Sequence, residues 1–281
     1  MLSKLLSLPE IERIDFDTSD RIAIHRKVFQ QKRMLREVMG EFHQLFWSLD
    51  HKYFGSARGS RVEIGAGVAP MKQSFPEVLA TDLVAAPYLD LQVDAQEMDL
   101  PSDSVRALYC QNCFHHFPEP QRFFSEVIRV VVSGGGAILI EPYYGPIASF
   151  MYKRLFATEG FDKTMPGWEA PTIGPMSGAN QALSYIMFRR DRQRFQEEFP
   201  SLDIVSMFPL KNYVRYLLSG GLNFRQLAPN FSIPLLKLCE FLAAPLAPVL
   251  ALHHVIILRK SGLVRTDNLG PKDERFANGV I

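Results

Sequence analysis

Two short apolar runs in the first third of the chain end in residues that suit a nucleoside. The first run leads into Glu63, Gly65, Ala66 and Gly67, and the second ends at Asp82. Two glycines one residue apart let the backbone approach a ligand where a Cβ would clash, and the amides of a helix start suit a polar or anionic group. A carboxylate at the next strand tip suits the two hydroxyls of a ribose. The spacing therefore predicts a nucleoside-type site.

The residue after this turn narrows the class of ligand. A dinucleotide site would need a third glycine at the position of Pro70, where a pyrophosphate is seated against the helix. Proline there instead suits the first turn of a helix. The sequence therefore disfavours nicotinamide and flavin cofactors, and a nucleoside without a pyrophosphate fits better.

Histidines and a glutamate follow two later apolar runs, 107–113 and 137–140. His115 and His116 follow the first run, and Glu141 follows the second. An imidazole with its ordinary pKa of about 6.5 can accept a proton from a hydroxyl nucleophile. The alternative is a structural pair, with one ring bonded to backbone and the other lining a pocket. Glu141 is expected either to orient a substrate or to lie on the rim of its site.

Cys110 and Cys113 form a CxxC motif, but the chain has no second such pair. Buried cysteines are the common case at the end of a core strand, and a structural zinc needs four ligands. The sequence therefore predicts no metal site.

These motifs occur in a fixed order. Together they resemble the class I S-adenosylmethionine-dependent methyltransferases, in particular their small-molecule branch. The resemblance covers about residues 60–142, with a last strand near 254–259. It rests on these motifs: Glu63-x-Gly65-x-Gly67, Asp82, Asp94-Ala95, Phe114-His115-His116-Phe117 and Glu126-x-x-Arg129 before Gly134-Gly135. It implies an α/β, doubly wound, mostly parallel seven-stranded sheet, with helices on both faces and the cofactor at the carboxyl ends of the first strands.

The resemblance also implies a role for each site residue. The cofactor is S-adenosyl-L-methionine and the product S-adenosyl-L-homocysteine. Expected cofactor contacts are Glu63 at the amino-acid end, Gly65, Ala66 and Gly67 at the turn, Asp82 at the ribose, and Asp94 and Ala95 at the adenine. Asn112 is expected near the cofactor too, but Cys113-Phe114 replaces the proline pair of enzymes that methylate base amines. Candidate catalytic residues are His116, which is favoured as the base, His115 and Glu141.

The elements that must position these residues follow from periodicity. Residues 20–50 predict one or two amphipathic helices, and 120–132 predict another. The gaps between Gly67 and Val78 and between Asp82 and Asp94 are too short for full helices. Because a parallel sheet is buried on both sides, the N-terminal helices or later insertions are expected to cover the face left open.

We expect three parts in the chain. Residues 1–55 form an N-terminal helical extension. Residues 56–262 form the methyltransferase domain, with cap insertions at about 158–200 and 211–252, and residues 263–281 a flexible tail. The very apolar stretch 231–252 is expected either to cover the acceptor pocket as a lid or to contact a membrane interface.

Composition limits the partners. The chain has 281 residues and a formal net charge of +1, which gives no support for a nucleic-acid partner. Its three cysteines favour a reducing cytoplasm, and the first residues do not resemble a secretory signal. We therefore expect a cytoplasmic protein, free or peripheral on the inner face of a membrane.

The expected activity is O-methylation of a small or lipid-linked acceptor, with a sugar intermediate as one option. The competing hypothesis is a non-catalytic S-adenosylmethionine-binding protein that acts as a membrane-associated partner or scaffold. The shortened helices, and Arg106 where relatives place an acid, keep this second hypothesis open.

Overall fold

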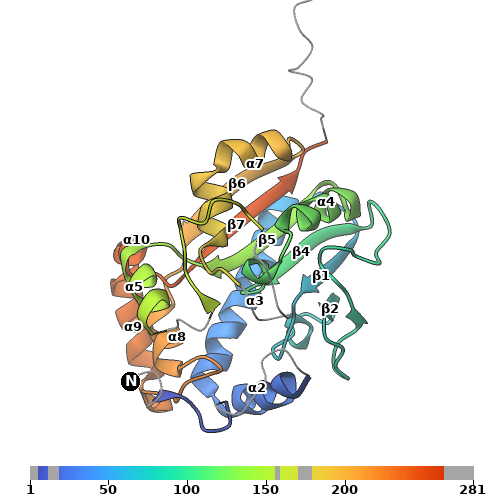
Figure 1. The fold of residues 1–281 in the computed structure, drawn as a ribbon. Helices are drawn as coiled ribbons and strands as arrows, with labels where there is room; N and C mark the ends of the chain where they lie inside the picture. The colour runs from blue at the N-terminus through green and yellow to red at the C-terminus, as the bar shows by residue number, and fades with distance from the viewer. Residues whose placement is uncertain (1–5, 12–18, 156–158, 170–178, 263–281) are drawn as a thin grey trace, which may run out of the picture.

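A computed structural model describes residues 6–11, 19–155, 159–169 and 179–262. Its centre is a seven-stranded sheet of order β3-β2-β1-β4-β5-β7-β6 (Figure 1). The strands are β1 (Ser60–Ile64), β2 (Val78–Asp82), β3 (Leu91–Gln92), β4 (Val105–Gln111), β5 (Val131–Pro142), β6 (Leu202–Pro209) and β7 (His253–Lys260).

Strands β3, β2, β1, β4 and β5 are parallel, and β7 runs antiparallel between β5 and β6. This order confirms the predicted doubly wound class. Because parallel strands end at one edge, the residues that follow β1, β2 and β4 meet there. The reversed β7 begins at the same edge, since its first residue, His253, pairs with Pro142 at the end of β5.

Helices and short turns connect these strands (Figure 1). The helices are α2 (Ser19–Gln31), α3 (Arg33–Phe54), α4 (Pro120–Val130), α5 (Pro146–Arg154), α6 (Leu183–Tyr185), α7 (Arg192–Glu198), α8 (Tyr213–Ser219), α9 (Ile233–Leu242) and α10 (Ala247–Leu250). Single turns are η1 (Met71–Gln73), η2 (Phe114–His116), η5 (Asn230–Ser232) and η6 (Ala244–Leu246), and η4 (Ile186–Arg190) is a π-helix.

One element boundary differs from prediction. The helix expected over 120–132 ends at Val130, and β5 starts at Val131, because the β-branched run continues directly into the sheet. Pro70 precedes only the single turn η1, in agreement with a gap too short for a full helix. No helix lies between β2 and β3 among the described residues.

The open sheet face is covered as expected. Helix α3 buries an apolar stripe against β4 and β5, consistent with its spacing of three and four residues. The opposite face is packed by α4 and by the helical segment 183–199, which contribute Phe123, Phe124, Phe188 and Phe195 to one cluster. This coverage removes the need for helices in the two short gaps.

Arg106, which had no predicted role, ties α3 to the sheet. Its guanidinium donates to Asp50 Oδ1 at 2.9 Å and to the Phe54 carbonyl at 2.9 Å. Arg61 donates to the other oxygen of Asp50 at 2.7 Å. Asp50 is fully buried, so both arginines compensate a carboxylate that burial would otherwise penalise. The residue therefore has a structural explanation and no longer supports the non-catalytic hypothesis.

A second buried ion network joins α3, α8 and α9. Arg215 donates to Glu240 Oε2 at 2.6 Å and to Glu41 Oε2 at 2.6 Å. The Arg215 and Glu240 side chains are only 5% and 3% exposed. The network fixes α9 with its single acidic residue turned inward.

Replacing Arg215 by methionine is expected to lower the free energy of unfolding by about 3–5 kcal/mol, because Glu240 would remain buried without its partner. The measurement is urea unfolding followed by circular dichroism. Arg33→Met is the matched control: it breaks a pair with Glu37 whose arginine side chain is 63% exposed, and it should cost at most about 1 kcal/mol. Equal effects of the two substitutions would contradict the assignment.

Candidate active site

The turn after β1 is shaped by its two glycines. Gly65 and Gly67 have φ of 65° and 53°, which an L side chain rarely adopts. A Cβ on Gly65 would lie 2.6 Å from Cys113 Sγ, whereas one on Gly67 would meet only a carbonyl at 3.8 Å. The Gly67 amide donates to Asp82 Oδ2 at 2.9 Å, so the turn and the tip of β2 are held together. Gly67 thus faces open space beside an acid.

That space is a cavity of about 400 Å³ at the strand tips, which we call the strand-tip cavity. It brings together most of the predicted cofactor residues. Those that line it are Gly65, Gly67, Asp82, Asp94, Ala95 and Asn112. The volume lies within the range of about 300–1,000 Å³ that is usual for small-molecule sites. The carboxyl ends of β1, β2 and β4 therefore form one pocket, as the resemblance implies.

Two predicted cofactor residues lie elsewhere. Glu63 and Ala66 line a neighbouring cavity and are not among the residues that line the strand-tip cavity. The Glu63 carboxyl group accepts a hydrogen bond from the Met71 amide at 2.7 Å. Burial, with a contribution from nearby Asp82, raises the pKa of Glu63 to about 8. The predicted contact of Glu63 with the amino-acid end of the cofactor stays a prediction.

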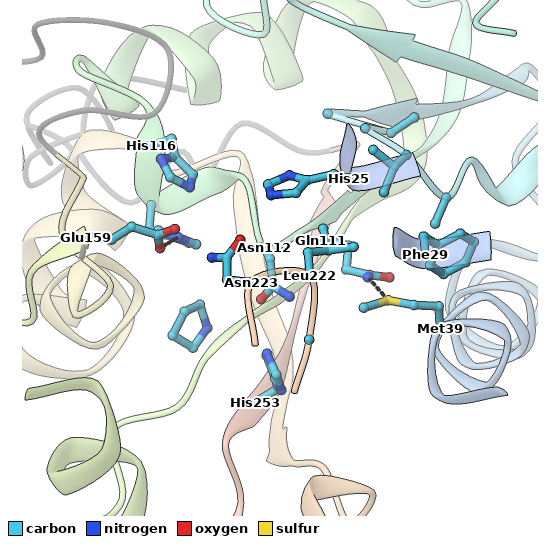
Figure 2. A pocket seen from close by; sticks show the side chains of 18 of the residues that line it. His25, Phe29, Met39, Gln111, Asn112, His116, Glu159, Leu222, Asn223 and His253 are labelled. Carbon is cyan, nitrogen blue, oxygen red and sulfur yellow. Dashed lines mark hydrogen bonds and ion pairs between the residues drawn. The ribbon is translucent and has the colours of Figure 1, made fainter. Parts of the chain in front are cut away.

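The neighbouring cavity has a volume of about 250 Å³, and we call it the histidine cavity because His25, His115, His116 and His253 line it. Figure 2 shows how several of its side chains converge from separate parts of the chain. Helix α2 supplies His25, the tip of β4 supplies Asn112, and β7 supplies His253.

The two cavities adjoin. Their shared lining residues are Arg21, Gly65, Gly67, Asn112 and His116. Asn112 has φ of 49°, a conformation that asparagine tolerates better than most residues. Its amide donates to the Ile140 carbonyl at 2.8 Å, which holds the tip of β4 against β5. A ligand in each cavity would therefore meet its neighbour at Asn112 and His116.

His115 is fixed between two carboxylates. Its Nδ1 lies 2.5 Å from Glu141 Oε2 and its Nε2 lies 3.3 Å from Glu159 Oε2. Glu141 Oε1 also accepts from the amides of Cys113 and Phe114 at 3.1 and 3.0 Å. Glu141 therefore shapes the turn 113–116 and is not among the residues that line either cavity. These contacts favour a positioning role for Glu141 over the predicted contact with an acceptor.

The carboxylates also set the charge of His115. Burial alone would lower its pKa, but Glu141 and Glu159 outweigh burial and raise the pKa to about 10. Conversely, although burial acts to raise the pKa of Glu159, its hydrogen bond and ion pair with His115 hold that pKa below its usual range. A ring that carries its proton at neutral pH cannot accept another, so the geometry does not support the predicted base role of His115.

This shift predicts a pH dependence of stability. A histidine whose folded pKa is raised from 6.5 to about 10 contributes fully below about pH 6.5, and the contribution is lost as pH rises towards 10. The difference in unfolding free energy between the native chain and a His115→Gln variant should therefore be larger at about pH 6 than at about pH 10. Denaturant unfolding at both pH values measures it, and a difference that does not change with pH would contradict the ion pair.

Two other histidines of the cavity, His25 and His253, are neutral at pH 7. Burial lowers the pKa of His25 to about 4 and that of His253 to about 3. Neutral imidazoles can both donate and accept hydrogen bonds. These two rings can therefore make polar contacts with a ligand, beside Arg21 and the His115–Glu159 ion pair that also line the cavity.

Ligand-type atoms of His115, His116 and Glu159 lie within 4.8 Å of one another, a spacing that would suit a divalent ion. Glu141 and Glu159 occupy both nitrogens of His115. As they are arranged here, His115 and the two carboxylates therefore form an ion pair.

Several lining residues were missed by sequence reasoning. Arg21 and His25 come from α2, Glu159 and Gln181 from the stretch after α5, and Tyr216 from α8. None carries a local motif, and each is brought in by a tertiary contact. Two basic residues of the 20–50 region make inward contacts: Arg26 lies over the Tyr88 ring, and Lys32 donates to the Gly221 carbonyl at 2.7 Å. Lys27, Arg33 and Arg36 are exposed.

Residues 64–139 match the family model described as a methyltransferase domain. The match runs from the tip of β1 into β5 and contains Asp82, Asp94 and His116. It confirms the resemblance drawn from the motifs. No curated protein matches the sequence.

Solved structures of similar fold include three methyltransferases. Geranyl diphosphate C-methyltransferase from Streptomyces coelicolor, solved with Mg²⁺, geranyl diphosphate and S-adenosyl-L-homocysteine, is 13% identical over 91% of this chain and 90% of its own, with a TM-score of 0.49. A SAM-dependent methyltransferase from Archaeoglobus fulgidus is 13% identical over 83% and 97%, with a TM-score of 0.48. Phosphoethanolamine N-methyltransferase 2 from Haemonchus contortus, solved with S-adenosyl-L-methionine, is 11% identical over 90% and 59%, with a TM-score of 0.46.

The strand order of the sheet and the match over residues 64–139 agree with each other. The chain therefore carries a class I methyltransferase domain, the domain type of the S-adenosylmethionine-dependent methyltransferases.

Proposed function

We propose that the protein transfers a methyl group from S-adenosyl-L-methionine to an oxygen of a polar acceptor, with S-adenosyl-L-homocysteine as the second product. The observation that carries the proposal is the pair of adjoining cavities. The strand-tip cavity is lined by the predicted adenosine contacts, and the histidine cavity next to it is lined by polar groups that suit an acceptor.

The strand-tip cavity fits the cofactor in two respects. Gly67 leaves open space where a Cβ would project, so a nucleoside can approach the backbone closely. Asp82 is nearly buried and presents a carboxylate beside that space. Its Oδ2 accepts a hydrogen bond from the Gly67 amide at 2.9 Å, and its Oδ1 accepts one from the Val84 amide at 3.0 Å. Each oxygen can accept a further hydrogen bond from a ribose hydroxyl.

The main task of the protein in this reaction is to align the acceptor oxygen with the methyl group. Bound S-adenosylmethionine supplies a methyl group that its sulfonium already activates. The residues at the junction of the cavities hold the acceptor in line with that methyl, and such positioning can supply about 7–11 kcal/mol of a barrier. His116 lies at this junction and is half-buried. We assign His116 the role of general base, which takes the proton from the acceptor hydroxyl.

The polarity of the histidine cavity supports a hydroxylated acceptor. Among the described residues, no hydrogen-bond donor reaches the buried side-chain oxygens of Gln111 and Asn112. Both line this cavity. Buried acceptor atoms without a partner are costly, and acceptor hydroxyls would satisfy them. A lipid-linked sugar or another small polyol has this chemistry.

The test is to identify the ligand that co-purifies and then the acceptor. Native mass spectrometry of the full chain should detect S-adenosylmethionine or S-adenosylhomocysteine, and incubation with extracts should give products that gain one methyl group. Linkage analysis should place that methyl on oxygen. Cofactor binding without any methylated product would leave the non-catalytic alternative, and failure to bind either nucleoside would overturn the proposal.

Gln111→Met separates the acceptor from the cofactor. Gln111 lines only the histidine cavity of the two, so the substitution should lower kcat/KM for the identified acceptor by about 2- to 10-fold, the effect of one hydrogen bond. The affinity for S-adenosylmethionine should not change. A loss confined to the cofactor would assign Gln111 to the other cavity.

A further inference from the structure

An exposed apolar surface covers one end of the molecule, where α5, α9 and α10 lie together (Figure 1). We call it the apolar end. It consists of large side chains that are each at least 40% exposed: Ile147, Phe150, Phe231, Leu235, Leu238, Phe241, Leu242, Leu246 and Val249. Single exposed apolar residues are common, but a contiguous patch usually marks an interaction site.

Helix α9 exposes its apolar side chains and buries its acidic one. Its outward positions carry Leu235, Leu238 and Phe241, which are 62%, 53% and 67% exposed. Its buried positions are Ile233 and Glu240, and Glu240 is paired with Arg215. A helix on the surface of a protein surrounded by water turns its apolar stripe inward. This one does the opposite, so its outer face is built for an apolar neighbour.

The apolar end is not a lid over the described cavities. None of residues 226–252 is among those that line the strand-tip or the histidine cavity. The alternative in which 231–252 closes the acceptor pocket therefore finds no support in the position of this segment.

The helices that form the apolar end carry exposed cations and no exposed acidic residue of their own. Residues 230–252 contain a single acidic residue, Glu240, which is buried, and α5 contains none. Lys153 and Arg154 are exposed in the last turn of α5, three and four residues after Phe150 and hence on the same side of the helix. The carboxylates of Glu37 and Glu41 on α3 also lie against α9, where both pair with Lys237 at 3.0 and 3.5 Å. An apolar surface bordered by the cations of α5 complements an anionic lipid headgroup layer.

We propose that the apolar end binds the surface of an anionic phospholipid bilayer, with α9 lying in the interface. No single helix in the described part of the chain is long and apolar enough to cross a membrane. The segments Asn230–Leu242 and Ala244–Leu250 reach that length and apolar character only when taken together, and the angle between them is 62°. Helix α9 has ten residues and so measures about 15 Å, half of a hydrocarbon core of about 30 Å. Helix α9 is therefore too short to cross the bilayer and enters one leaflet only.

Helix α5 connects this surface with the histidine cavity. Phe150 projects outward at the apolar end, whereas Tyr152 lines the cavity and donates to the Leu252 carbonyl at 2.6 Å. A molecule held in the bilayer surface would thus lie on the other side of one helix from the cavity. Membrane binding itself does not depend on the proposed methyl transfer and is tested without it.

The experiment is flotation of the full chain with two kinds of vesicle, phosphatidylcholine alone and phosphatidylcholine mixed with phosphatidylserine. The intact chain should float with the anionic vesicles. Leu238→Ser/Phe241→Ser should lower the partition coefficient by at least about tenfold, since two large apolar side chains no longer enter the interface. Leu91→Ser/Val205→Ser is the matched control, because both are exposed apolar residues outside the apolar end, and it should float like the intact chain.

The double variant Lys153→Gln/Arg154→Gln tests the electrostatic contribution to membrane binding. It should weaken binding by roughly fivefold per charge on the anionic vesicles and leave binding to phosphatidylcholine unchanged. No flotation of the intact chain, or equal flotation of the Leu238→Ser/Phe241→Ser variant, would overturn the proposal. So would a concentration-dependent dimer in sedimentation that this variant abolishes while no form floats, because the apolar end would then bind a second copy.

Discussion

A His116→Ala variant should turn over about 10²- to 10⁴-fold more slowly than the native enzyme, the loss typical of a positioned general base. His116 lies where the two cavities adjoin, so its ring can reach an acceptor hydroxyl aligned with the cofactor methyl. The measurement is a single-turnover rate with the identified acceptor.

The control for His116 is His25→Gln in the same cavity. His25 lines only the histidine cavity of the two, so its loss should cost no more than about tenfold, the worth of one hydrogen bond. Calorimetry should show that His116→Ala changes the S-adenosylmethionine affinity by no more than the same factor. Full turnover in His116→Ala would remove this residue from the chemistry and leave alignment alone.

Asp82→Ala is expected to weaken S-adenosylmethionine binding by about 10- to 100-fold, since hydrogen bonds to a charged group contribute about 1.5–3 kcal/mol. The substitution removes the proposed partner of the ribose and also the acceptor of the Gly67 amide. Both changes act on the strand-tip cavity. Isothermal titration calorimetry measures the affinity, and thermal unfolding shows whether the variant remains folded.

Asp99→Ala provides the comparison for Asp82. Asp99 is an exposed carboxylate outside both cavities, and its removal should leave the affinity unchanged. If Asp82→Ala binds the cofactor as tightly as the native chain, the ribose is held elsewhere and the assignment of the strand-tip cavity is wrong.

Local sequence predicted the sheet well because its signals are short-range. Runs such as 78–80 and 137–140 are continuously apolar, as is typical of strands buried on both faces. A glycine turn follows β1, and a carboxylate lies at the end of β2. Parallel strands bring those ends to one edge, so the predicted contacts Gly67, Asp82, Asp94 and Ala95 lie around one cavity. The predicted helix end at residue 132 was wrong by two residues, since valines there suit either a helix end or a strand start.

The residues that line the histidine cavity could not be predicted from local sequence in the same way. Glu159 reaches His115 across 44 residues, and Arg215 reaches Glu41 across 174. Periodicity and turn signals act over a few residues, and they carry no information on such pairs. The role of Arg106 was likewise invisible until Asp50 of α3 was placed beside it.

The sequence by itself determined the class of the fold, the turn Gly65-Ala66-Gly67 and the acid that follows on β2, because strand patterning and backbone freedom are local properties. Only the tertiary structure decided the charge of His115 and which way α9 faces. The charge of His115 is set by two carboxylates from distant segments, and the outward apolar face of α9 is set by the buried pair of Glu240 with Arg215. Electrostatic environment and burial depend on neighbours in space, and the fold alone supplies these.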